Sequence, residues 1–404
     1  MNRSMGAFCT FLFGIVSLQL GSPCQAYNIS EGLSINGFLS QGYIKSRHNN
    51  FLGNSGSGSW QLNEFALTTN YMATDNLRFG FQLLSRDVGA DGNNDILIDW
   101  AVADYHWQDW FGLRLGKVKL PIGLYNQGRD IGFLRPMVFL PQSIYDENKR
   151  TLVVAALGTS IYGNISFGDN GDLDYQAYYG KVDFREDSGQ ARGMEQLVMK
   201  SALQRGLGEV SDFEADNRYV YGGALVYTPP LDGLRLGVSY FSGQSDFDFR
   251  LGAREADARG TNKDFVVLSM EYFLTDWKLA IEYTEFTGDR EVLGIDIVDG
   301  RSQGAYVQLC CHTFEPLVLS VLYDVFYADK DDHDGSNFVA NGQADFLAWR
   351  KDFAVGVRWN ISDQLIVKAE HHWLNGAGLQ LPLFNPQGVE EDWSYFVLKT
   401  SFNF

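Results

Sequence analysis

One segment, residues 121–150, carries the densest set of side chains that could act on a solute. Its candidate residues are Arg129, Asp130, Arg135, Asp146, Glu147, Lys149 and Arg150. Charges of both signs held in a narrow space create an electric field that favours hydrated polar solutes over apolar ones. The same segment holds an apolar run, residues 137–140, which a fully solvated loop would not need. We therefore expect the segment to fold back into the interior of the protein, to pack on the strands that surround it, and to narrow the path of a solute there. The alternative is an outer loop packed on its neighbours.

A second set of charged residues recurs within stretches of alternating polarity. Its members are Arg78, Arg114, Arg235, Lys278, Glu282, Asp324, Arg358, Lys368, Glu370 and Lys399. Successive side chains of a strand point to opposite faces, so each of these residues shares a face with other polar side chains. The pattern predicts that they line the pore wall, with a ladder of bases opposite the acids of residues 121–150. Each of them could instead serve only to hydrate the interior.

Signals for metal binding are weak. His371 and His372 are neighbours on an expected strand and point to opposite faces, so they cannot chelate one ion together. Residues 329–335 are acidic, but they fail the EF-hand spacing because Lys330 would occupy the first ligand position. We expect this stretch to be a solvated outer loop. The sequence therefore predicts no metal site and no cofactor.

Signals for catalysis are equally weak. The sequence contains neither a Gly-x-Ser-x-Gly nucleophile motif nor a His-Glu-x-x-His zinc motif. A hydrolase would need a nucleophile, a base and an orienting acid at one rim. Only His106 with Asp104 and His312 with Ser320 offer a start, and neither pair forms a motif. We expect a protein that is not an enzyme. A barrel with a surface, adhesive or hydrolytic role remains the alternative.

The composition of the chain excludes several classes of protein. Of its 404 residues, 45% are hydrophobic and 20% are charged, which excludes a disordered chain. The formal net charge of −18 argues against a nucleic-acid partner, which would require a basic surface. After residue 26 no uncharged apolar run reaches the ~18 residues that a membrane-spanning helix needs. Frequent glycines and aromatic residues favour strands and tight turns.

The elements that must position the charged residues are strands. Residues 77–83 and 317–325 alternate strictly between apolar and polar side chains, which is typical of strands with one apolar face. The sequence predicts about sixteen strands of this kind. They cover residues 32–44, 60–72, 76–88, 95–107, 110–120, 151–165, 172–183, 217–228, 233–242, 263–274, 276–287, 303–312, 315–328, 351–360, 363–374 and 392–404.

The connections between these strands alternate in length. The short turns are residues 73–75, 108–109, 168–171, 229–232 and 361–362. The long loops are residues 45–59, 121–150, 184–216, 243–262, 288–302, 329–350 and 375–391. Such alternation is typical of outer-membrane barrels, which have short turns at one end and long loops at the other. Within the loop 184–216, apolar residues at near-helical spacing predict a short helix over residues 189–206.

A closed membrane barrel explains this pattern. In lipid every backbone N–H and C=O group must be paired, so a sheet can span only by closing on itself. About sixteen strands enclose more space than side chains fill, which leaves a water-filled channel. The fold class predicted here is all-β: a transmembrane antiparallel β-barrel of about 16 strands with an inward-folded third loop. Aromatic residues beside the short turns, such as Trp110, Trp277 and Trp359, fit an interfacial girdle.

The two ends of the chain add to this prediction. Residues 1–26 have the layout of a secretory signal peptide, with Arg3, an apolar stretch and small residues before Tyr27. Residues 27–404 would then form the outer-membrane β-barrel. The last strand alternates and ends on Phe404, which resembles the C-terminal signal of bacterial outer-membrane proteins.

One short motif carries a family resemblance. Residues 116–123 read Gly-Lys-Val-Lys-Leu-Pro-Ile-Gly at the end of the fifth expected strand. This motif resembles the Gram-negative outer-membrane porins related to the phosphate-selective porins O and P. The resemblance extends over residues 27–404 in strand layout, loop order and the terminal Phe404.

The resemblance implies a trimeric diffusion channel in the cell outer membrane, in contact with lipid and lipopolysaccharide. The expected function is passive diffusion of small hydrophilic solutes or ions through a water-filled pore. Phosphate selectivity is not carried over, because we cannot place the basic anion-binding arm of that family in this sequence. The net charge of −18 favours a weak preference for cations, which a basic ladder on the wall could reverse.

Overall fold

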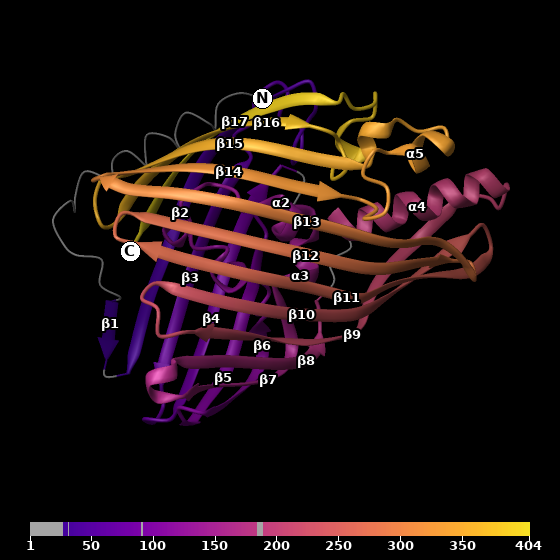
Figure 1. Cartoon of the computed structure of the whole chain (residues 1–404). Coiled ribbons are helices and arrows are strands. Elements are labelled where there is room, and N and C mark those ends of the chain that lie inside the picture. The colour runs from indigo at the N-terminus through magenta and orange to yellow at the C-terminus, as the bar shows by residue number, and fades with distance from the viewer. Residues whose placement is uncertain (1–26, 31, 90–91, 184–188) are drawn as a thin grey trace, which may run out of the picture.

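The computed structural model describes residues 27–30, 32–89, 92–183 and 189–404, which form one closed antiparallel sheet (Figure 1). Sixteen strands of this described chain build the wall: β2 (Leu33–Arg47), β3 (Leu62–Met72), β4 (Leu77–Val88), β5 (Ile96–Gln108), β6 (Phe111–Lys119), β7 (Ala155–Ser166), β8 (Asp172–Lys181), β9 (Val210–Thr228), β10 (Leu234–Leu251), β11 (Arg254–Leu274), β12 (Trp277–Val292), β13 (Ile295–Phe314), β14 (Leu317–Tyr327), β15 (Trp349–Asn360), β16 (Leu365–Asn375) and β17 (Asp392–Asn403).

Pairing between the first and last wall strands closes the barrel. Each strand pairs with its neighbour in the chain, and β17 pairs with β2, as in Phe402 opposite Leu39. The short strand β1 (Tyr27–Ser30) pairs with the start of β2. The predicted barrel of about 16 strands is therefore confirmed. The predicted signal peptide, residues 1–26, lies outside the described residues.

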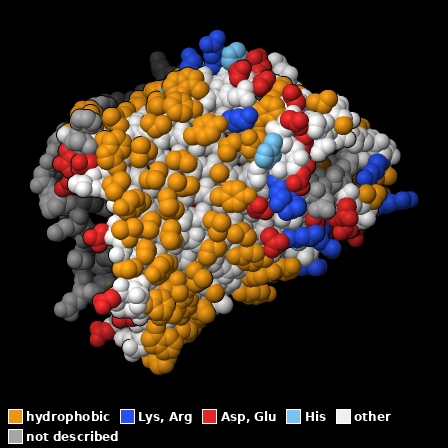
Figure 2. Space-filling view, in the orientation of Figure 1, with side chains coloured by type: hydrophobic (Ala, Val, Ile, Leu, Met, Phe, Trp, Pro, Cys, Tyr) orange, Lys and Arg blue, Asp and Glu red, His pale blue; other side chains and the backbone are white. Residues whose placement is uncertain are grey.

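The wall has an apolar outer face and a mostly polar inner face. Along β14, Leu319, Val321 and Tyr323 are exposed on the outside, whereas Ser320 and Asp324 are buried on the inside. Figure 2 shows apolar side chains spread over the strands, with charged side chains gathered where α4 (Gly189–Arg205) and the long hairpins project. An apolar belt of this kind is what a barrel presents to lipid. None of the described helices is long and apolar enough to cross a membrane.

Two of the expected long loops are instead strands. Residues 243–262 and 288–302 continue β10–β11 and β12–β13, which turn only at residues 252–253 and 293–294. Gly252 and Gly294 have positive φ angles, which glycine adopts without strain at a tight turn. The alternation of apolar and polar residues continues through these stretches, so their polar composition alone was a poor guide. The hairpins form a tall section of wall beside the shorter strands β2–β8 (Figure 1).

The helix expected over residues 189–206 is confirmed as α4. Its side chains Met194 and Val198 are buried against Phe247, Phe249 and the neighbouring strands of the tall hairpins. This contact explains why the hairpins extend beyond the barrel: their inner faces have an apolar partner. In the described part of the chain the other helices are short: α2 (Gln142–Tyr145), α3 (Arg150–Val153), α5 (Ser336–Ala340), η1 (Asn126–Gly128), η2 (Gly132–Leu134), η3 (Glu147–Lys149), η4 (Gly168–Asn170), η5 (Asp345–Leu347) and η6 (Pro382–Phe384).

The largest apolar core lies inside the barrel, against the connection between β6 and β7. We call this connection, residues 120–154, the third loop. Its apolar side chains in the core are Leu120, Ile122, Met137, Leu140, Ile144, Tyr145, Leu152 and Val153. They pack on Phe241, Val267, Ala280, Tyr306, Leu322 and Ala354 of the wall. The apolar content of the third loop is therefore explained by burial against the inner wall.

Candidate pore constriction

Buried acids on the wall hold the backbone of the third loop. Glu282 on β12 accepts a hydrogen bond from the backbone N–H of Leu124 at 2.8 Å and from the hydroxyls of Tyr145 at 2.5 Å and Tyr306 at 2.7 Å. Burial, followed by the charge of Glu282, raises the pKa of the Tyr145 hydroxyl well above its usual value, so this hydroxyl remains a donor. Glu282 thus fixes the first limb of the loop.

Two further wall acids hold the tip and the returning limb. Glu370 on β16 accepts from the backbone N–H groups of Val138 at 2.7 Å and Phe139 at 3.2 Å. Asp324 on β14 accepts from the backbone N–H of Ser143 at 3.2 Å. Hydrogen bonds to a charged acceptor are stronger than neutral ones, and buried carboxylates require such donors. These contacts place the loop tip against β14 and β16.

Lys368 completes the attachment from the same strand as Glu370. Its ammonium group donates to the backbone carbonyls of Gly132 at 2.5 Å, Arg135 at 2.6 Å and Met137 at 3.1 Å. Three donors of one ammonium thus meet three carbonyl oxygens of the irregular loop backbone. Lys368, Glu370, Asp324 and Glu282, expected to line the pore, face inward but are covered by the third loop.

On its opposite side the third loop meets the wall through ion pairs. Glu147 of the loop lies 2.9 Å from Arg86 on β4 and 2.9 Å from Arg129 of the loop. Burial alone would raise the pKa of the Glu147 carboxyl, but the guanidinium groups of Arg129 and Arg86 outweigh burial and hold it well below its ordinary value. Glu147 therefore carries a fixed negative charge that ties the loop to β4.

A second group of ion pairs stands where the third loop leaves the wall. Asp130 of the loop pairs with Lys119 and Arg150. Asp99 on β5 lies 2.7 Å from Lys119 and 3.0 Å from Arg150. Burial would raise the pKa of Asp130, but the charges of Arg150 and Lys119 hold it well below its usual value. Two acids and two bases therefore close a compact charged cluster at the root of the loop.

The seven candidate residues of the loop do not share one environment. Arg129, Asp130, Arg135, Glu147 and Arg150 are buried. Asp146 is also buried, 3.6 Å from the ammonium of Lys149, whose side chain is 43% exposed. Segments that contact β4, β12 and β16 at once must lie in the lumen, so the charges of the third loop are inside the barrel. Most of them meet partner charges rather than water.

The open space inside the barrel lies beside the short strands. One cavity of about 410 Å³ is lined by Arg78, Trp100, Arg114 and Asp130, among others. A second cavity of about 610 Å³ shares Arg114 and reaches Arg235 and the β5–β6 turn at Asp109. Together they form what we call the inner vestibule, between the third loop and the turn end of the barrel.

Charged groups of both signs line the inner vestibule, and arginines reach into it from several strands. Asp104 on β5 is shared by Arg78 at 2.8 Å and Arg114 at 3.1 Å. Glu271 on β11 is shared in the same way by Arg235 at 3.2 Å and by Lys278. The three arginine side chains are 34%, 26% and 47% exposed, whereas the two carboxylates are almost covered. A solute beside these pairs meets exposed guanidinium groups, whereas at the turn end it also meets the exposed carboxylates of Asp109 and Asp174.

The two remaining wall candidates lie apart from this space. Arg358 on β15 donates to the backbone carbonyl of Phe133 at 2.7 Å, so it also contacts the third loop. Lys399 on β17 is buried in an ion pair with Glu64 on β3. Glu64, Arg86 and Asp99 were not identified from the sequence. Arg86 shares its strand face with Arg78, so the alternation could have found it.

In the described part of the chain no group of three or more His, Cys, Asp or Glu side chains is placed to hold a metal ion. In the acidic loop, Asp332 accepts hydrogen bonds from the Ser336 hydroxyl at 3.0 Å and the Asn337 N–H at 3.1 Å, so it stabilises the start of α5. Ser320, a candidate catalytic residue of a hydrolase, is buried with its hydroxyl 3.5 Å from the Cys310 sulfur. Asp104, a member of the other candidate catalytic pair, accepts hydrogen bonds from Arg78 and Arg114.

Comparisons with known proteins give a fold and little sequence similarity. No family model matches the chain. An uncharacterized protein of Aquifex aeolicus (strain VF5) is 26% identical over 106 residues, which are 26% of this chain. The match spans only 23% of that relative's own length.

Solved structures match over nearly the whole chain. Outer-membrane OmpT of Vibrio cholerae superimposes with a TM-score of 0.56 at 12% identity, covering 94% of this chain and 100% of that one. OmpF of Salmonella typhi, solved with daunomycin, gives 0.55 at 14% identity, covering 92% and 97%. An anion-selective porin from Comamonas acidovorans gives 0.53 at 12% identity, covering 92% and 99%. The chain therefore has the fold of these outer-membrane proteins.

Proposed function

We propose that the protein is a porin: a water-filled channel for passive diffusion of small hydrophilic solutes and ions across the outer membrane. The observation that carries this proposal is the combination of a closed barrel, a charged inner vestibule and a third loop attached across the lumen. A lumen lined by charge stabilises hydrated solutes. A barrel of this width with a purely structural role would gain nothing from a charged lumen.

The proposal can be tested by liposome swelling with the purified protein. Vesicles that contain the protein should swell in isotonic solutions of small neutral sugars, and the rate should fall steeply as the sugar becomes larger. Vesicles with heat-unfolded protein are the control. A folded protein that gives no swelling with any sugar would leave a surface or hydrolytic role as the better reading.

The exposed charges of the inner vestibule further suggest a preference for anions. The net charge of −18 by itself favours cations, but charge far from the pore is screened within about 10 Å at ordinary salt. The exposed guanidinium groups of Arg78, Arg114 and Arg235, whose partner carboxylates are covered, act directly on the permeating ion. The exposed Asp109 and Asp174 oppose them only at the turn end. The reversal potential in a potassium chloride gradient should have the sign of chloride preference; the opposite sign would contradict this part of the proposal.

We also propose a homotrimer assembled through the face of the short strands. β5 pairs with β6 only from Ala101 onward, and Ile96, Ile98 and the nearby Leu157 project outward, largely exposed. An unpaired strand edge with apolar neighbours needs covering, which a second copy would supply. OmpT of Vibrio cholerae has been solved in a trimer form. Lipid and lipopolysaccharide would surround the remaining face. Mass measurement in detergent tests this: a monomer only would contradict it.

A further inference from the structure

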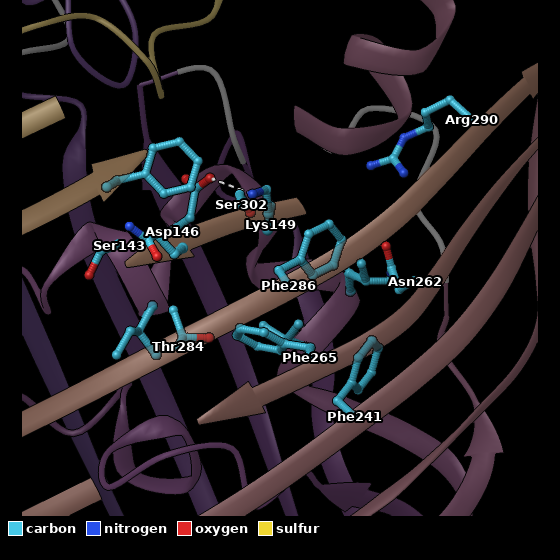
Figure 3. A pocket seen from close by; sticks show the side chains of 15 residues that line it. Ser143, Asp146, Lys149, Phe241, Asn262, Phe265, Thr284, Phe286, Arg290 and Ser302 are labelled. Carbon is cyan, nitrogen blue, oxygen red and sulfur yellow. Dashed lines mark ion pairs between the residues drawn. The ribbon is translucent and has the colours of Figure 1, made fainter. Parts of the chain in front are cut away.

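A third cavity lies on the other side of the third loop, away from the two cavities of the inner vestibule. It is bounded by α2, η3 and α3 of the loop and by β10–β14 of the wall (Figure 3). Its lining atoms enclose a narrow space that is partly open to solvent. Its open core is narrow, with about 50 Å³ available to the centres of water-sized molecules. We call it the outer pocket.

Aromatic rings form the floor of the outer pocket. The rings of Phe241 and Phe265 meet edge to face at 6.4 Å, and those of Phe265 and Phe286 at 6.0 Å. Phe326 contributes a fourth ring from β14. Edge-to-face and offset contacts are the arrangements in which aromatic rings attract one another. A narrow space between such rings accepts a flat ring more readily than a branched aliphatic group.

Two cations stand at the opening of this aromatic floor. The ammonium of Lys149 lies 5.7 Å from the ring centroid of Phe286 and 5.9 Å from that of Phe326. The Arg290 guanidinium, which points into the pocket in Figure 3, donates to the backbone carbonyl of Asp289 at 3.0 Å. The carboxylate of Asp289 itself pairs with Lys263 at 2.5 Å.

The acids near the outer pocket do not neutralise both cations. Asp146, the acid that lines it, lies 3.6 Å from the Lys149 ammonium. Among the described residues Arg290 makes no ion pair with a carboxylate, so its guanidinium keeps donors for a ligand. Among the described lining groups, two bases therefore face one acid, and the pocket favours a negatively charged ligand.

We propose that the outer pocket binds small aromatic carboxylates, with the ring between the phenylalanines and the carboxylate on Arg290 and Lys149. This inference rests on the proposed channel function, for which it names a solute class. A lone carboxylate would lack the aromatic contact, and an aromatic ammonium ion would meet two like charges. Both kinds of compound should therefore bind more weakly than an aromatic carboxylate, which makes them informative probes.

The test is calorimetric titration of the purified, detergent-solubilised protein with benzoate, acetate and benzylammonium. Benzoate should bind, acetate at least ten-fold more weakly, and benzylammonium without measurable heat. The Arg290→Gln and Phe265→Leu variants should each weaken benzoate binding at least ten-fold. Arg250→Gln is the matched control, because Arg250 lies on the same tall wall, is half-exposed and pairs with Asp212 at 3.6 Å. It should bind benzoate as the wild type does.

Equal binding of benzoate and acetate, or unchanged binding by Arg290→Gln, would overturn the inference. If Phe265→Leu fails to fold, as judged by its gel mobility with and without heating, Lys149→Gln takes its place, because Lys149 is exposed and its loss leaves no cavity. Binding is measured in detergent without a membrane, so its result does not depend on whether the protein forms a channel. If vesicles swell but the protein does not bind benzoate, only the ligand inference is overturned. If the protein binds benzoate but vesicles do not swell, the proposed channel function is overturned and the ligand site remains.

Discussion

The two sides of the third loop are held in different ways. Toward β10–β16 the wall residues Glu282, Asp324, Lys368 and Glu370 bind the loop through its backbone. Toward β4 and β5, Arg86 and Asp99 bind side chains of the loop. Backbone contacts depend on the wall residue alone, whereas ion pairs require a matched residue on each partner. The loop position is therefore encoded mainly in the wall on one side and jointly by loop and wall on the other.

Removing the loop tip should have the largest effect on transport. Deletion of residues 131–141 removes the backbone groups that Glu370 and Lys368 bind, together with Met137 and Leu140 of the core. Single-channel conductance should rise several-fold, because the lumen is then obstructed by less chain. A control deletion within the acidic outer loop, residues 330–334, should leave conductance unchanged. Equal conductance of the tip deletion and the wild type would show that the tip does not narrow the pore.

Glu370 tests the backbone-bound side of the comparison. The change Glu370→Ala leaves the amides of Val138 and Phe139 without an acceptor and His372 without one of its acid partners. Losing a buried charged partner costs about 3–5 kcal/mol. Urea unfolding of the protein in vesicles should show a drop of that order. The matched variant Glu391→Ala, at an exposed loop end, should change stability little; a similar loss in both would contradict the assigned contacts.

Acid pH tests the ion-paired side. The folded pKa values of Glu147 and Asp130 lie well below their ordinary values of 4.5 and 3.8. Their pairs therefore contribute full stability above those ordinary values, and the contribution is lost only as pH falls toward the folded pKa values. Thermal unfolding should be flat between about pH 6 and 5 and should decline below about pH 4. The double variant Arg86→Gln/Glu147→Gln should show a smaller decline. A decline already between pH 7 and 5 would contradict the fixed charges.

The smallest expected effect concerns ion preference. Arg235 is half-exposed in the inner vestibule, and its pairing with Glu271 can be taken over by Lys278. The Arg235→Gln variant should therefore fold normally and shift the reversal potential by a few millivolts toward cations. The change Lys263→Gln, in the middle of β11 and outside the lining of the inner vestibule, should leave the reversal potential unchanged. A larger shift from Lys263→Gln than from Arg235→Gln would place the selective charge outside the inner vestibule.

Alternation in the sequence predicted the strands because each strand has one apolar and one polar face. The same rule predicted that Glu282 and Arg235 face inward, but it could not tell that the third loop covers Glu282 and leaves Arg235 open. Coverage depends on contacts between residues far apart in the chain, such as Leu124 with Glu282.

The extended hairpins were missed for a related reason. Residues 243–262 and 288–302 are polar enough to look like loops, and their strand form depends on packing against α4. The apolar residues of the loop tip, by contrast, were informative. A run such as Met137 to Leu140 requires burial, and the nearest apolar surface is the inner wall.

Single-channel recording in a planar lipid bilayer tests the central claim most directly. We predict stepwise openings of the wild-type protein, with current proportional to voltage and an amplitude that increases with salt concentration. A barrel that inserts and remains folded, as judged by its heat-dependent gel mobility, yet passes no current in any salt would contradict the account.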